Sequence, residues 1–98
     1  MTAYVINDME ITDPQRFEEY KRLSPPTVAA YGGRFLARGG EVTALEGAWQ
    51  PRRLVMLEFP SVAQAQAWLN SPEYAPARTL RQLSANSRMV VIEGMPPA

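Results

Sequence analysis

The order in which strand and helix patterns follow one another restricts the fold of this chain more than any other feature. A β-rich apolar segment at residues 3–9 precedes a helical pattern at 14–31, and two further β-rich segments cover residues 34–39 and 53–59. A second helical pattern follows from residue 61, and a last β-rich segment covers residues 89–93. The chain therefore contains a β-α-β unit twice, in the order β-α-β-β-α-β.

This order predicts an α+β domain with the ferredoxin-like βαββαβ arrangement, in which four antiparallel strands lie in the order 4-1-3-2 and both helices cover one face. Residues 1–98 are assigned to a single domain, since 98 residues are enough for only one. The first strand carries apolar residues on both faces, with Tyr4 and Ile6 on one and Val5 and Met9 on the other. Such a sheet is covered on both sides, so we expect a homodimer that pairs sheet face to sheet face.

A proline pair predicts that the first helix bends. Asp13 and Pro14 have the residue types of an N-cap and a first helical position. A proline inside a helix removes a backbone hydrogen bond and clashes with the preceding turn, so Pro25–Pro26 predict a kink or a restart near Ser24. Gly32 is placed to act as the C′ residue that ends the helix.

The second helical pattern is also predicted to be interrupted. It begins with the capping-box sequence at residues 61–64. It should break near Asn70, because Ser71 and Pro72 provide a new N-cap and a new first position, and then continue from Pro72 to about Ala85. Both helices are therefore expected to be kinked, with Phe17 and Trp68 among the residues that face the sheet.

Composition excludes several classes of function. Ten basic and ten acidic residues give no net charge, and the pI is near 6.2, so neither nucleic acid nor an anionic membrane is an expected partner. Without cysteine or histidine the chain lacks thiolate and imidazole ligands, and we expect no metal and no cofactor. Catalysis would have to use a carboxylate, tyrosine, arginine, the backbone or water. With neither a signal sequence nor a membrane span, the expected location is cytoplasmic.

The stretch from Tyr31 to Trp49 contains two glycine pairs and two arginines. Alternation along a strand places Arg34, Leu36 and Arg38 on one face, which would suit either a cavity lining or a solvated strand face. The connection to the next strand is long, and long ordered loops are often functional. Within it, residues 42–45 could form a short edge strand, and residues 46–47 a turn.

Four runs of sequence carry a family resemblance: YGGRFLARGG, LEG-x-W, RLVMLEFPS and AWLNSPEYAPARTLR. Together they resemble DUF1330, a family of unknown function in the dimeric α+β-barrel superfamily, over nearly the whole chain. The resemblance implies that two four-stranded sheets of a homodimer face each other. It implies no particular reaction, because the superfamily includes cofactor-free monooxygenases, muconolactone isomerase-like enzymes and haem-dependent chlorite dismutases. The missing histidine argues against a haem role.

The candidate site combines an arginine, a carboxylate and nearby aromatic residues. Arg38 and Glu58 would face each other if the second and third strands are neighbours; Arg38 would hold an anionic or enolate-like oxygen and Glu58 would act as a base. The alternative is a structural ion pair at the subunit interface. Tyr31 is included as a further catalytic candidate and proton carrier. The candidate ligand-binding residues are Arg34, Trp49, Ser71, Tyr74 and Arg78.

Each of these residues also has a structural explanation. Ser71 can simply cap a helix, Tyr74 can pack on the stem of Arg78, and Trp49 can cover an interface. The sequence therefore predicts one of two alternative functions. The first is a cofactor-independent enzyme or a binding protein for a small anionic, partly apolar molecule, and the second is a non-catalytic dimeric module that has a structural or small-molecule-sensing role.

Overall fold

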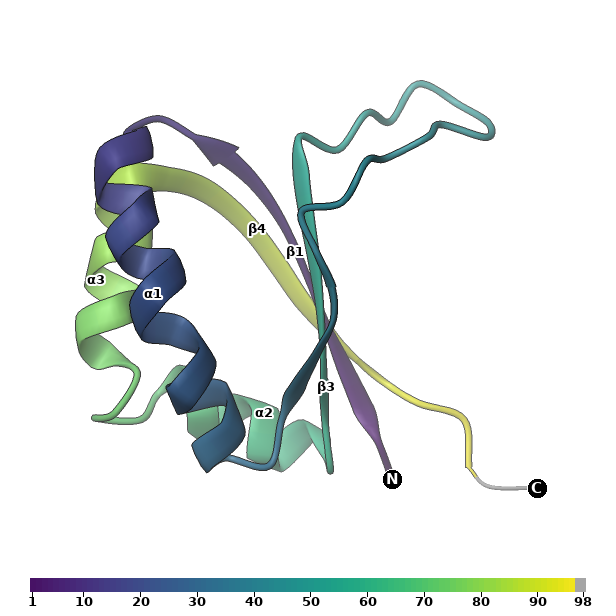
Figure 1. The fold of residues 1–98 in the computed structure, drawn as a ribbon. Helices are drawn as coiled ribbons and strands as arrows, with labels where there is room; N and C mark the ends of the chain where they lie inside the picture. Colours follow the sequence, from purple (N-terminus) through teal and green to yellow (C-terminus); the bar gives the residue numbers. More distant parts are fainter. Residues whose placement is uncertain (97–98) are drawn as a thin grey trace.

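The computed structural model describes residues 1–96, which form one four-stranded antiparallel sheet with three helices on one of its faces (Figure 1). The strand order is β2-β3-β1-β4, which confirms the predicted order 4-1-3-2. The elements along the chain are β1 (Ala3–Ile11), α1 (Pro14–Ala30), β2 (Arg34–Arg38), β3 (Arg53–Phe59), α2 (Val62–Leu69), α3 (Ala75–Ser84) and β4 (Ala85–Glu93).

The core lies between the sheet and the helices. Alternate residues of β1 and β3 point into it, and Val5 lies opposite Leu57 in the register of these two strands. Trp68 on α2 fills the centre: it is 1% exposed, and its ring stacks at a centroid distance of 4.2 Å on Tyr74 and 5.3 Å from Phe59. The predicted core positions of Phe17 and Trp68 are confirmed.

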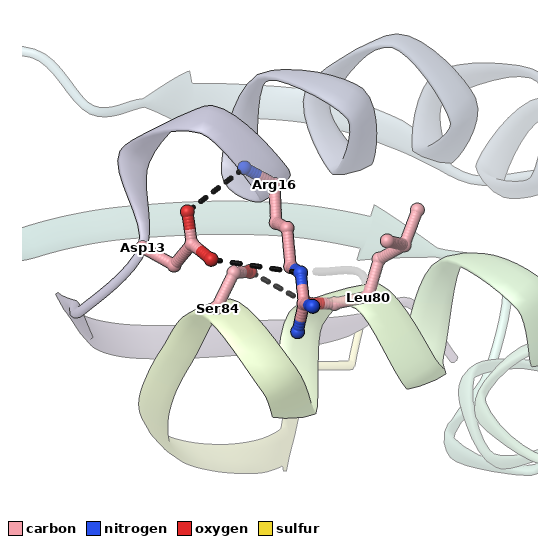
Figure 2. Close-up of polar contacts among 4 residues, drawn as sticks. All are labelled: Asp13, Arg16, Leu80 and Ser84. Atoms are coloured by element: carbon pink, nitrogen blue, oxygen red, sulfur yellow. Dashed lines mark hydrogen bonds and ion pairs between the residues drawn. The ribbon is translucent and has the colours of Figure 1, made fainter.

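The junction before α1 is fixed to the junction after α3. Asp13 caps α1 as predicted, because its Oδ1 accepts the backbone N–H of Arg16 at 3.2 Å (Figure 2). The backbone N–H groups of Thr12 and Asp13 both donate to the carbonyl of Ser84, at 2.8 and 3.1 Å. Ser84 Oγ donates in turn to the carbonyl of Leu80 (Figure 2). These contacts hold the start of α1 against the end of α3.

Of the kink or restart predicted for the first helix, the restart does not occur, because α1 runs without a break from Pro14 to Ala30 and includes Pro25 and Pro26. A proline at position 25 leaves the carbonyl of Lys21 without its usual helical donor. That carbonyl instead accepts Arg38 Nη2 at 2.6 Å. The helix ends as predicted, with Gly32 after the C-cap at a φ of 76°.

The predicted break of the second helix is confirmed, but the second part starts later than expected. Residues 71–74 form a turn in which Ser71 Oγ donates to the carbonyl of Trp68 and accepts the N–H of Tyr74, so α3 begins at Ala75 rather than Pro72. Strand β4 starts at Ala85, well before the predicted Met89. The cause is backbone pairing with a β1 that itself continues to Ile11.

Residues 39–52 connect β2 to β3 without any helix or strand, so the edge strand considered for residues 42–45 does not form. This connection projects away from the helices, on the side of the sheet that they leave uncovered (Figure 1). Gly47 has a φ of 81°, as a turn there requires. Within the described part of the chain, no helix is long and apolar enough to span a bilayer.

Because the chain approaches the core closely just before β2, alanine substitutions at two glycines are predicted to have different effects on the free energy of unfolding. A Cβ on Gly33 would lie 2.6 Å from Phe59 Cε1, and the Phe59 ring is 1% exposed and cannot move freely. We expect Gly33→Ala to lower the free energy of unfolding by about 1–3 kcal/mol through overpacking. Gly40 has nothing within 4 Å of the same position, so Gly40→Ala should change it by less than about 0.5 kcal/mol. Urea denaturation measures both, and equal effects would contradict the packing around Gly33.

Candidate functional site

A β-bulge in β2 separates the two arginines that alternation had placed on one face. Arg34 lies opposite Glu58, but the register shifts between Phe35 and Ala37, and Arg38 lies opposite Val55. Val55 and Glu58 are three positions apart on β3 and therefore point to opposite faces. The predicted shared face of Arg34, Leu36 and Arg38 is wrong, and so is the predicted pairing of Arg38 with Glu58.

Glu58 pairs instead with Arg34, on the face of the sheet that the helices leave uncovered. Arg34 Nε donates to Glu58 Oε2, and the Arg34 side chain is 73% exposed. An exposed pair of this kind contributes only about 0–1 kcal/mol to stability. Glu58 lies on the opposite face of the sheet from Arg38, so within this chain it cannot act as a base for a molecule held by Arg38.

Arg38 and Arg53 lie together on the helix side of the sheet, at the mouth of a narrow apolar cleft. The Arg38 guanidinium lies 4.8 Å from the centre of the Phe35 ring, and that of Arg53 lies 5.2 Å from the centre of the Phe17 ring. We call this space the arginine cleft. Its walls come from α1, β1, β2 and β3 with one residue each from α2 and β4, and its lining residues include Asn7, Tyr20, Lys21, Ser24, Val28, Leu57, Trp68 and Met89.

The two arginines repel each other. Neither forms an ion pair with a carboxylate among residues 1–96, whereas Lys21 at the same mouth is paired with Glu18 at 2.7 Å. Partial burial, followed by the charge of Arg38, lowers the pKa of Arg53, while Glu18 acts in the opposite direction. Gly39 has a φ of 70°, a backbone conformation that favours glycine, and the Arg53 guanidinium occupies the space that a Cβ at this position would take. The backbone therefore makes room for a second, partly desolvated cation.

Polar side chains are also present on the otherwise apolar walls. Asn7 is 4% exposed, and its Oδ1 has no hydrogen-bond partner among the described residues. Tyr20 Oη lies 2.8 Å from Tyr74 Oη, and Tyr74 Oη accepts Arg81 Nε at 3.2 Å. Burial, and then the neighbouring Tyr74, raise the pKa of Tyr20 well above its ordinary value. Tyr20 is thus a hydrogen-bond donor rather than a base.

The remaining candidate residues lie outside the cleft. Tyr31 Oη donates to Glu73 Oε1 at 2.7 Å on the surface, and this hydrogen bond is the main reason that its pKa is raised. Trp49 is 62% exposed on the 39–52 connection, where its Nε1 donates to Asp8 Oδ2 at 3.4 Å. The others, Ser71, Tyr74 and Arg78, lie around the turn and helix α3, where Ser71 and Tyr74 are buried.

The structure thus brings only Arg38, of the candidate residues, into the cleft. Arg53, Asn7 and Tyr20 were missed. Strand alternation was the signal that could have found the first two, because Arg53 shares a face with Val55 and Leu57, and Asn7 stands between Val5 and Met9. A polar residue in such a buried row is unusual and calls for a partner.

The sequence comparisons agree with this fold. The model of a domain of unknown function, DUF1330, matches residues 2–95. The chain belongs to the DUF1330 family. Among curated proteins no match was found.

Solved structures similar to this DUF1330 protein share its fold at low sequence identity. RPA0582 of Rhodopseudomonas palustris, a protein of unknown function, is 21% identical with a TM-score of 0.78, covering 98% of this chain and 84% of its own. SnoaB, a cofactor-independent oxygenase of Streptomyces nogalater, is 15% identical with a TM-score of 0.67, and the match covers 98% of this chain and 95% of SnoaB. A dimeric protein of unknown function with a ferredoxin-like fold from Bacteroides fragilis is 12% identical with a TM-score of 0.56, and the match covers 95% of this chain and 96% of that protein. These similarities establish the ferredoxin-like fold.

The buried phenol of Tyr20 gives the folded state a dependence on alkaline pH. Its pKa is raised in the folded protein, so above about pH 10 the unfolded chain loses this proton first and binds fewer protons than the folded one. The contribution of Tyr20 to stability is present below that pH and declines above it. We expect the free energy of unfolding to fall between about pH 9 and pH 11, and to fall less in Tyr20→Phe. Urea denaturation across this range tests it, and identical declines would contradict it.

Proposed function

We propose that the arginine cleft binds a small, partly apolar anion, with a short-chain carboxylate as the simplest example. The observation that supports this most strongly is the convergence of Arg38 and Arg53 at an apolar opening without an ion-paired carboxylate among residues 1–96. A bound carboxylate would relieve the repulsion between the two guanidinium groups. Arginine presents its N–H donors in a planar fork that matches a carboxylate.

The interior of the cleft sets the size of what can enter beyond the arginines. Its free volume is about 20 Å³, which is room for about one water-sized group. The apolar part of a ligand can therefore extend toward Leu57 and Val28 by about one such group, and a larger one requires a wall of the cleft to move. Strand β2 is the wall best suited to move, because it is a five-residue edge strand with a bulge.

The chemistry of the lining favours binding over proton abstraction. The cleft-lining residues among 1–96 include no carboxylate and no histidine, and Tyr20 holds its proton tightly. The second candidate function is a cofactor-independent enzyme, in which the same arginines would stabilise an oxyanion that develops on the substrate. The fold shared with the cofactor-independent oxygenase SnoaB supports this second candidate function. A cytoplasmic location stays a prediction.

We also propose that the protein is a homodimer through the open face of its sheet. Ile6 lies opposite Met56 on one side and Val90 on the other, and Val90 and Ile92 are 62% and 57% exposed. The 39–52 connection flanks this face (Figure 1) and is held to it where the backbone N–H of Arg52 donates to Asp8 Oδ1 at 3.2 Å. A second copy would cover the apolar row, and the similar protein of Bacteroides fragilis is described as dimeric.

Anion binding can be followed through the two tryptophans. Trp68 lines the cleft, whereas Trp49 lies on the projecting 39–52 connection and does not line it. Titration with propionate at constant ionic strength should shift the indole N–H resonance of Trp68 and leave that of Trp49 in place. Propanol, which lacks the charge, should bind at least about tenfold more weakly. Arg53→Gln should weaken propionate binding by a similar factor, again about tenfold.

Arg34→Gln is the matched control for that titration, since Arg34 is an exposed arginine of the opposite face. It should bind propionate as the wild type does. Equal losses in the two variants, or a wild-type protein that does not respond to propionate, would contradict the binding proposal. A dimer that fails to respond would favour the alternative of a non-catalytic structural module.

The dimer proposal is tested by mass. We expect light scattering at micromolar concentration to give twice the chain mass of 10.9 kDa. Val90→Glu should shift the protein toward the monomer, because it puts a charge into the proposed interface. Leu83→Glu is the control, as Leu83 is 55% exposed on α3, away from the open face. A monomeric wild type, or the same effect of both substitutions, would contradict the proposed interface.

A further inference from the structure

The hydrogen-bond chain beneath the cleft has a direction that follows from its donors. Arg81 Nε can only donate, so Tyr74 Oη accepts from it. Tyr74 is 0% exposed, and among the described residues its hydroxyl has only Arg81 and Tyr20 as partners. Because a buried O–H is almost always paired, we assign the Tyr74 proton to the hydrogen bond with Tyr20 Oη. The proton of Tyr20 is then left for a third group.

That third group lies on the cleft side of Tyr20. Tyr20 is one of the residues that line the cleft, so its proton can be donated to a group inside it. The chain from Arg81 therefore ends in one O–H donor at the cleft wall.

An acceptor without a partner lies on the opposite wall. Asn7 Oδ1 is buried and unpartnered within residues 1–96, and Asn7 lines the same cleft from β1. A donor and an acceptor across a space that fits one water-sized group match a hydroxyl, which accepts one hydrogen bond and donates another. A methyl group in this position would leave both protein groups unpaired.

We propose that the cleft recognises a hydroxyl group, and that its ligand is a short hydroxycarboxylate. This rests on the proposed function, because Arg38 and Arg53 hold the carboxylate at the mouth while the hydroxyl enters between Tyr20 and Asn7. Tyr74 and Arg81 are positioning residues, since they fix the direction of the Tyr20 donor without touching the ligand. The small interior volume selects against branched or longer groups at the inner end.

The test compares propionate with lactate and 3-hydroxypropionate, which place a hydroxyl at two distances from the carboxylate. With the Trp68 resonance as the readout, we expect at least one hydroxyacid to bind about tenfold more tightly than propionate. Tyr20→Phe should remove this preference, so that neither hydroxyacid binds more tightly than propionate does. Tyr31→Phe, which removes a surface tyrosine hydroxyl, should keep the preference.

Asn7→Leu is the second variant, and it should also remove the preference, so the proposal can be judged even if Tyr20→Phe does not fold. Propionate binding without any preference for either hydroxyacid would overturn the hydroxyl site and leave the anion site standing. A preference that survives both Tyr20→Phe and Asn7→Leu would also overturn it. If neither propionate nor the hydroxyacids bind to the wild type, the proposed function itself fails.

Discussion

A single hydrogen bond between Arg38 and the carbonyl of Lys21 links the features on which this structure depends. Pro25 cannot donate to that carbonyl, and the guanidinium of Arg38 takes its place at 2.6 Å. The same contact holds the edge strand β2 against α1 and keeps Arg38 at the mouth of the cleft. A proline that looked like a helix breaker therefore creates the acceptor that positions a candidate binding residue.

The bulge in β2 divides the charged residues between two surfaces with different roles. Arg34 and Glu58 stay on the open face, where they neutralise each other beside the apolar row of the proposed interface. Arg38 turns to the helix side, where it meets Arg53 without a carboxylate partner among the described residues. The proposed dimer contact and the proposed ligand site thus lie on opposite faces of one thin sheet, and changes on one face need not disturb the other.

Much of the fold could be predicted from the sequence because it follows from local patterns. Strand alternation, the Asp13 cap, the exit at Gly32 and the break after Leu69 all depend on a few adjacent residues. The site was less predictable. Alternation assigns residues to the correct face only in a regular strand. Nothing in the residues around Phe35 signals the bulge that moves Arg38 to the other face of the sheet. The pairing of Tyr20 with Tyr74 joins residues 54 positions apart, which no local pattern reveals.

The central claim is that an anion binds between Arg38 and Arg53 on the helix side of the sheet. A crystal structure with 3-bromopropionate tests it most directly, because anomalous scattering locates the bromine independently of any model. We expect the bromine inside the arginine cleft, with the carboxylate on the two guanidinium groups. Bromine found only beside Arg34 on the open face, or in no ordered position at concentrations that saturate the Trp68 shift, would contradict it.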